Sequence, residues 1–253
     1  MLEDVASIAA EAGRIAASRS GTDYKTWEKV PGHPVCDVDL ELDAFLRGRL
    51  EALDPEAGWL SEETLDDSDR IERRRLWVVD PIDGTRDFLR GRPGWCVSIA
   101  LVEDRVPVLG ALAAPIRGEM WTAARGLGAR LNGEPIKVSP RAALEGARVP
   151  TDQLPSVDAD LVPVARPNSI ALRIAMVAAG AADLVATLRW GFEWDIAAAA
   201  LIAEEAGATV SGVLGQPLAF NSASGEAFGV LVATPGIHAA AVERLRERAM
   251  AVV

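Results

Sequence analysis

The sequence predicts an α+β fold in two subdomains. With 253 residues, 49% hydrophobic and 25% charged, the chain is long enough for two cores that share an interface. Apolar runs at 97–102 and 106–113 flank a charged turn, and a third follows at 120–123, as in an antiparallel meander. From about residue 143 short strands alternate with alanine-rich helices. We therefore expect an N-terminal α+β subdomain over 1–142 and a C-terminal α/β subdomain over 143–253.

The first part of the chain predicts two amphipathic helices. Apolar residues recur at helical spacing through 2–19 and again through 37–53, where a proline follows the second helix. Between them, the prolines and glycines of 22–36 are typical of a hairpin or a loop. The polar run 65–75 is expected to be an exposed connection.

Composition excludes several classes of function. The net charge of −11 argues against a nucleic-acid polymer as partner, because binding one requires a basic face. No apolar run approaches the ~20 residues of a membrane span, and no signal segment is recognisable, so a cytoplasmic location without membrane contact is expected. Cys36 and Cys96 are expected to be free thiols. Two histidines make a histidine-rich zinc site or a Ser-His-Asp triad hard to build.

The densest chemical signal lies at Leu76–Thr85. Its apolar start indicates a strand buried on both faces, which Pro81 is expected to end because it cannot donate a ladder hydrogen bond. The following Gly84 permits close approach of the backbone to a ligand, and Thr85 is a plausible cap for a short helix whose amides face an anion. The sequence Asp-Pro-x-Asp-Gly is also ordinary turn chemistry. The stretch alone leaves both interpretations open.

Four motifs, in order, resemble the inositol monophosphatase superfamily of magnesium-dependent phosphatases. They are Pro34-Val35-Cys36-Asp37-Val38-Asp39, Ser61-Glu62-Glu63-Thr64, Asp80-Pro81-Ile82-Asp83-Gly84-Thr85 and Gly191-Phe192-Glu193-Trp194-Asp195-Ile196-Ala197-Ala198. Cys36 stands where the family usually has Thr or Ser, and Ser61 where it has Gly. The resemblance covers nearly the whole chain. It implies a layered αβαβα sandwich with the site in the cleft between two subdomains, and homodimers are common among relatives.

The resemblance also implies a set of metal ligands. They are the carboxylates of Glu62, Asp80, Asp83 and Asp195 together with the backbone carbonyl of Ile82. Hard oxygen ligands without His or Cys select magnesium or manganese over zinc. We therefore expect two or three Mg²⁺ ions.

Further roles follow from the resemblance. Thr85 together with Asp39 or Glu62 would orient and deprotonate the attacking water, and the amides of Gly84 and Thr85 would hold phosphate oxygens. Two of the acids have ordinary alternative explanations. A carboxylate such as Asp39 suits the first turn of any helix, and Asp195 would cap the helix that runs to Ala206.

The implied reaction is the Mg²⁺-dependent hydrolysis of a phosphate monoester of a small metabolite. Inositol monophosphatases carry a substrate-binding glutamate about two turns before the Trp-Asp pair, where this chain has Thr187-Leu188-Arg189-Trp190. Arg189 and Trp190 suit an anionic or aromatic substrate, and Trp190 is equally well explained as a core residue. Segment 150–163 is short, whereas relatives commonly carry a helix there. Family kinship further implies inhibition by lithium.

These features favour a 3′(2′),5′-bisphosphate nucleotidase acting on 3′-phosphoadenosine 5′-phosphate, in which Trp190 or Phe192 meets the adenine and an arginine meets the second phosphate. The alternatives are an inositol-1-phosphatase and a histidinol-phosphate phosphatase. A non-enzymatic module that binds an ion or a metabolite is the alternative from another class. The complete set of acids together with Thr85 argues against it.

Overall fold

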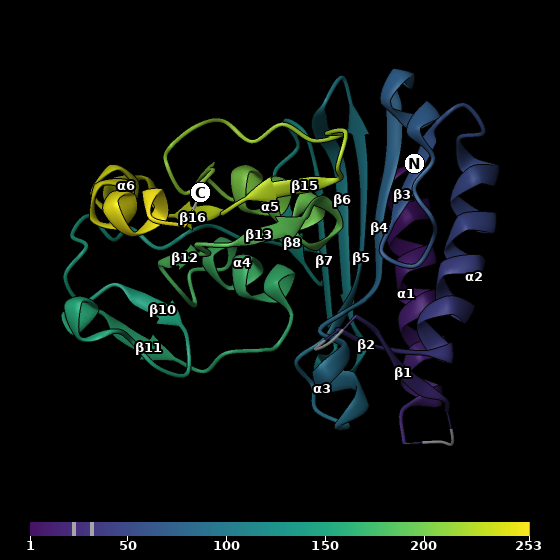
Figure 1. Ribbon diagram of the computed structural model, residues 1–253, viewed down its shortest axis with the longest axis horizontal. Helices are drawn as coiled ribbons and strands as arrows, with labels where there is room; N and C mark the ends of the chain where they lie inside the picture. Colours follow the sequence, from purple (N-terminus) through teal and green to yellow (C-terminus); the bar gives the residue numbers. More distant parts are fainter. Residues whose placement is uncertain (22–23, 31–32, 253) are drawn as a thin grey trace.

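The protein is built in five layers, visible from right to left in Figure 1, and the computed structural model describes residues 1–21, 24–30 and 33–252. Helices α1 (Leu2–Arg19) and α2 (Asp37–Leu53) cover one face of a large sheet, and α4 (Ile170–Ala178) and α5 (Ala197–Glu205) cover the other. A smaller sheet and α6 (Pro235–Met250) complete the stack. This arrangement confirms the predicted αβαβα sandwich. No helix within the described ranges has the length and apolar character needed to cross a membrane.

The large sheet has the strand order β3-β4-β5-β6-β7-β8-β9. Strand β3 is parallel to β4, and every later neighbour is antiparallel, which confirms the predicted meander. Asn132 and Gly133 join the last two strands with positive φ angles, as an Asn-Gly hairpin turn requires. The strands are β3 (Gly58–Ser61), β4 (Arg75–Asp83), β5 (Cys96–Glu103), β6 (Val106–Ala114), β7 (Glu119–Ala124), β8 (Ala129–Leu131) and β9 (Glu134–Pro135).

Helices cover both faces of the central strands of the large sheet, so the side chains that alternate between these faces are buried on either side. In β4, Trp77 and Val79 pack into the cluster formed with α1 and α2, whereas Leu76 and Val78 pack into the cluster formed with α4 and α5. A strand covered by helices on both faces has no solvent side, which explains the continuous apolar sequence. The predicted boundary near residue 143 stays a prediction, since the second cluster draws residues from both sides of it.

The remaining elements are short. The hairpin expected within 22–36 is present, and residues 22–23 and 31–32 lie outside the described residues. The strands are β1 (Thr26–Val30), β2 (His33–Cys36), β10 (Arg148–Pro150), β11 (Val162–Val164), β12 (Leu184–Ala186), β13 (Trp190–Phe192), β14 (Thr209–Ser211), β15 (Glu226–Phe228) and β16 (Leu231–Ala233). The short helices are η1 (Ser68–Glu72), α3 (Thr85–Leu89), η2 (Pro115–Arg117), η3 (Ser156–Asp158) and η4 (Glu193–Asp195).

Two local predictions are wrong. Strand β4 continues through Pro81 to Asp83, because an irregularity in its register against β5 takes up the proline that lacks a ladder donor. The run 65–75 is not wholly exposed, because Arg70 in η1 is only 2% exposed. A charged segment that the sequence predicts to be exposed therefore contains one buried residue, Arg70.

Candidate metal centre

Three aspartates from two distant segments converge beside the large sheet. Asp80 and Asp83 lie at the end of β4 and are buried, and the half-buried Asp195 ends η4. One carboxylate oxygen of each lies within 4.8 Å of those of the other two. Carboxylate oxygens at this separation can share a divalent cation.

The start of α4 holds Asp83 in place. The carboxylate accepts hydrogen bonds from the Ser169 hydroxyl, from Ala171 N at 2.8 Å and from Ile170 N at 3.3 Å. The positive end of the helix dipole also favours a negative charge there. Sequence reasoning missed these three partners, and the only available signal was Ser169, which caps α4 by accepting from Leu172 N.

The backbone turns after β4 in such a way that the Thr85 side chain contacts the end of this strand, which carries Asp80 and Asp83. Gly84, with φ +98°, is the cap residue of α3, so the expectation that Thr85 caps this helix is wrong. A Cβ at Gly84 would lie 2.7 Å from the Gly94 carbonyl oxygen, which makes glycine a requirement. Thr85 is the first helical residue, and its hydroxyl donates to the Ile82 carbonyl at 3.1 Å, while Ile82 N donates to Asp80 at 2.9 Å.

Asp195 does not cap the helix that follows it. Ile196 occupies the cap position of α5, so the capping explanation for Asp195 is wrong. The preceding Trp194 carbonyl accepts a hydrogen bond from the Ser98 hydroxyl at 3.4 Å. This contact joins η4 to β5 and brings Asp195 to the end of the large sheet.

Glu62 and Asp39 lie outside the group of three and still act on it electrostatically. Glu62 follows β3, and its charge contributes to the raised pKa values of Asp80 and Asp195. Asp39 is 1% exposed in the first turn of α2, where its carboxylate accepts from Cys36 N at 2.8 Å and from Cys36 Sγ at 3.0 Å. The amide and the thiol of Cys36 thus both contact the Asp39 carboxylate. Cys36 and Cys96 are both free, as predicted.

The three aspartates repel one another strongly. Burial raises the pKa of Asp80 well above its usual range, and the charges of Glu62, Asp83 and Asp195 raise it further. Burial likewise raises the pKa of Asp195 and of Asp83, and hydrogen bonds to Asp83 partly oppose this. Among the residues whose side chains the structure describes, no lysine or arginine forms a salt bridge with any of the three. A set of oxygen ligands that carries several negative charges and forms no salt bridge fits Mg²⁺.

Uncompensated positive charge lies next to the acids. The exposed Arg189 lines a small hollow together with Phe192 and Asp195. Arg173 on α4 was missed by sequence reasoning; it is half-buried, and its guanidinium donates to the carbonyls of Pro167 and Asn168. Burial and the nearby guanidinium groups of Arg166 and Arg189 lower the pKa of Arg173 to about 10, and Asp83 opposes this.

Neither Arg173 nor Arg189 has a carboxylate within 4.0 Å among the described residues, whereas Arg166 pairs with Asp152 at 2.5 Å. Trp190 is 54% exposed and packs edge-on against Phe228, so its explanation as a core residue is wrong. It is not among the residues that line the hollow.

A cavity of about 230 Å³ in the C-terminal half adjoins this hollow, because Ile170 and Thr187 line both. Arg166 and Arg173 stand in its wall, and most of the remaining lining is apolar. The apolar residues include Val149, Leu154, Leu161, Leu184, Leu188 and Leu245. Asp195 thus lines a hollow that adjoins a space large enough for an organic group.

Comparison with known proteins places this geometry in a family. The family model described as the inositol monophosphatase family matches residues 1–252. The chain is 40% identical over 190 residues to the Nus factor SuhB of Xylella fastidiosa, covering 69% of this chain and 67% of that protein. It is 30% identical over 240 residues to the 3′(2′),5′-bisphosphate nucleotidase CysQ of Aggregatibacter actinomycetemcomitans, covering 87% of each.

Among solved structures, an IMPase of Thermotoga maritima superposes with a TM-score of 0.84 at 28% identity, covering 100% of this chain and 99% of that one. The match extends over all layers of the fold and over the segments that carry the acids. The chain therefore belongs to the inositol monophosphatase family.

Proposed function

We propose that this protein hydrolyses the phosphate monoester of a small metabolite with Mg²⁺ held by Asp80, Asp83 and Asp195. The observation that carries the proposal is the convergence of two buried aspartates and one half-buried aspartate, none of which forms a salt bridge with a cationic side chain that the structure describes. Family membership supplies the enzyme class, phosphoric monoester hydrolase, as predicted from the sequence. Glu62 and the Ile82 carbonyl are further proposed ligands, and two or three ions are proposed from the number of oxygens.

The residues around the acids have separate proposed roles. When bound, the ions polarise the phosphate and lower the pKa of the attacking water. The amides of Gly84 and Thr85 donate to phosphate oxygens, as backbone donors in such turns do. The Thr85 hydroxyl, with Asp39 or Glu62, orients and deprotonates the water. No covalent nucleophile is required.

We further propose that the substrate carries a second anionic group, which favours a 3′(2′),5′-bisphosphate nucleotide. Support comes from Arg173 and Arg189, two guanidinium groups that lack a carboxylate partner beside the acids. The adjoining apolar cavity offers room for a base. Phe192 lines the hollow, so it is better placed than Trp190 to meet a ring.

Inositol 1-phosphate is the second candidate substrate. It is favoured by the match over the full chain to a solved structure named an IMPase. It is disfavoured because the region in which an inositol monophosphatase has a glutamate that binds inositol hydroxyls contains Leu188 and Arg189 in this chain. Histidinol phosphate remains a third candidate on family grounds.

The decisive experiment measures turnover of the three phosphate monoesters with Mg²⁺. Wild type is compared with Asp83→Asn, and Asp183→Asn serves as a matched control because it alters a buried aspartate that contacts arginines instead of the acids. We expect loss of turnover in Asp83→Asn alone. Equal rates in Asp83→Asn and wild type would remove the mechanism, and a nucleotide that is the slowest substrate would overturn the proposed preference.

The second anion can be tested separately with Arg173→Gln. This variant should raise KM for the bisphosphate about tenfold, as loss of a charge-assisted contact predicts, and leave KM for p-nitrophenyl phosphate unchanged. Arg117→Gln, whose parent residue forms an exposed ion pair with Glu119, is the matched control. An equal KM shift for both substrates would contradict a role in recognising the second anion.

Three further properties stay predictions. Millimolar lithium should inhibit turnover, and unchanged activity would count against close kinship in mechanism. Light scattering should show a homodimer. A cytoplasmic location is proposed from the sequence.

A further inference from the structure

Behind the acids, a chain of buried polar side chains joins the segment that carries Glu62 to the segment that carries Asp195. Its members are Arg70, Asn221 and Glu193, which are 2%, 4% and 0% exposed. Buried polar and charged groups of this kind are costly to move, because any displaced group loses its hydrogen bonds without gaining water. Their contacts therefore fix the distance between the segment that carries Glu62 and the segment that carries Asp195.

The Arg70 end of this chain holds the segment that follows Glu62. Arg70 donates from Nε and Nη2 to the two carboxylate oxygens of Asp66, at 2.5 and 2.7 Å. Its remaining nitrogen, Nη1, donates to Asn221 Oδ1 at 2.7 Å, and Asn221 Nδ2 donates back to the Arg70 carbonyl at 3.1 Å. Because Asp66 lies four residues after Glu62, the guanidinium ties that segment to the C-terminal half.

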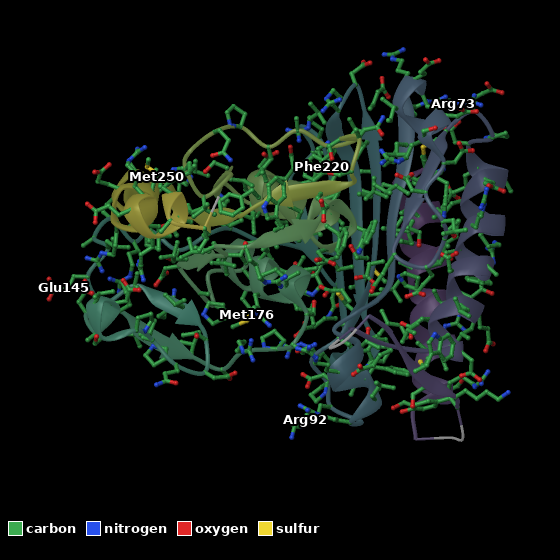
Figure 2. All side chains as sticks on the ribbon, in the orientation of Figure 1. Arg73, Arg92, Glu145, Met176, Phe220 and Met250 are labelled. Carbon is green, nitrogen blue, oxygen red and sulfur yellow. The ribbon has the colours of Figure 1, made fainter. Side chains whose placement is uncertain are left out.

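The Glu193 end holds the segment that carries Asp195. The Glu193 carboxylate accepts from Asn221 N at 2.6 Å and from Ser222 N at 2.8 Å. Glu193 lies two residues before Asp195 within η4, and its own amide donates to the Gly225 carbonyl at 2.9 Å. Figure 2 shows the neighbouring Phe220 where the C-terminal half meets the large sheet. Asn221 thus contacts both Arg70, which holds the segment of Glu62, and Glu193, which lies beside Asp195.

We propose that Arg70, Asn221 and Glu193, here called the clamp, are positioning residues that set the separation between Glu62 and Asp195 and so the affinity of the centre for divalent cations. This inference rests on the proposed metal-dependent function. The acids repel one another when no cation is bound, so a rigid support is needed to keep them together. Residues that orient metal ligands typically change metal affinity 10- to 100-fold when removed.

A substitution at Asn221 can cut the clamp at one point. Asn221 has φ +60°, and Asn221→Gly keeps this conformation accessible and keeps the amide that donates to Glu193. It removes only the side chain that contacts Arg70. Binding of Mn²⁺ is followed by electron paramagnetic resonance of the free ion, so no turnover is required. We expect about tenfold weaker Mn²⁺ binding in the variant.

The matched control is Arg148→Gln, which cuts another buried network, that of Asp183, away from the acids. It should lower the melting temperature and leave Mn²⁺ affinity unchanged. A merely structural role for the clamp predicts the same result for Asn221→Gly, and that result would overturn the proposal while leaving the proposed function intact.

A second variant tests whether the clamp acts as one unit. Arg70→Lys keeps the charge but cannot reach Asp66 and Asn221 at the same time, so it should weaken Mn²⁺ binding as Asn221→Gly does. The double variant should bind Mn²⁺ no more weakly than whichever single variant has the lower Mn²⁺ affinity, because both substitutions remove the contact between Arg70 and Asn221. Additive losses would overturn the clamp as a unit. Failure of wild type to bind Mn²⁺ would overturn both the metal centre and the clamp.

Discussion

Asp80 and Asp183 are both buried aspartates, and their surroundings are opposite. Arg148 donates to Asp183 at 2.7 Å and Arg141 lies 3.1 Å away, and the Ser139 hydroxyl also donates to it. Burial alone would raise the pKa of Asp183, but hydrogen bonds from Arg148 and Ser139 hold it well below its usual range. Asp80 has other acids as its charged neighbours, and its pKa is raised.

The charges around a buried aspartate distinguish a carboxylate that stabilises the fold from one that is suited to bind a cation. A buried charge that serves the fold is neutralised by side chains of the same chain. A buried charge that is left among like charges costs stability, and such an arrangement is expected where an external ion completes the site. The comparison therefore supports the proposed role of Asp80 independently of any motif.

The largest expected difference is in turnover. Asp80→Asn should lower kcat at least 10³-fold, equivalent to about 4 kcal/mol of transition-state stabilisation, because the variant loses a charged metal ligand. Asp183→Asn, assayed below its melting temperature, should stay within a factor of about three. Comparable loss in both variants would mean that fold stability, and not the acid cluster, governs activity.

The next difference is in stability. Asp183→Asn should lower the free energy of unfolding by about 3 kcal/mol, because it leaves Arg148 and Arg141 without their buried partner. Urea unfolding of the metal-free protein measures this. A loss below about 0.5 kcal/mol would show that solvent already screens the pair.

Asp80→Asn should have the opposite sign in the same experiment. Removing one charge from the repelling cluster should raise the metal-free melting temperature by roughly 2–4 °C, as about 1 kcal/mol does for a chain of this size. Added Mg²⁺ should raise the melting temperature of wild type and have little effect on the variant. A variant less stable than metal-free wild type would contradict the proposed repulsion.

The smallest effect is in the pH dependence of stability. The folded pKa of Asp80 is raised, so its penalty is absent below the unfolded value of about 4 and develops as the pH rises above it. The folded pKa of Asp183 is lowered, so its contribution is present above about pH 4 and is lost as the pH falls further. The difference from wild type should therefore shrink between pH 7 and 4 for Asp80→Asn, and below pH 4 for Asp183→Asn.

Much of the architecture could be predicted from local patterns. The helix period at α1 and α2 and the apolar run of β4 are patterns that can be recognised within one short segment, and these elements are present as expected. Predictions failed where a distant segment decided the outcome. Strand β4 passes through Pro81 because β5 accommodates the irregularity, and Arg70 is buried because Asn221 lies opposite it.

In the candidate site, too, local motifs could be recognised from the sequence, whereas the arrangement of distant segments could not. Motif order singled out the acids, but their mutual distances, the support of Asp83 by the start of α4 and the position of Arg173 near Asp83 depend on residues far apart along the chain. Periodicity carries no information about such pairs. Trp190 illustrates the limit, since its sequence context fitted a core position and the fold exposes it.

The sequence by itself determined the helices and the central strands, because local backbone preference and side-chain pattern are properties of short segments. Its motifs, through their resemblance to the family, also supplied the proposed set of oxygen ligands. The tertiary structure decided which carboxylates remain without a cationic partner and which are neutralised. That distinction arises from the packing of distant segments, since the same side chain, aspartate, is stabilised at position 183 and repelled at position 80 by what the fold places around it.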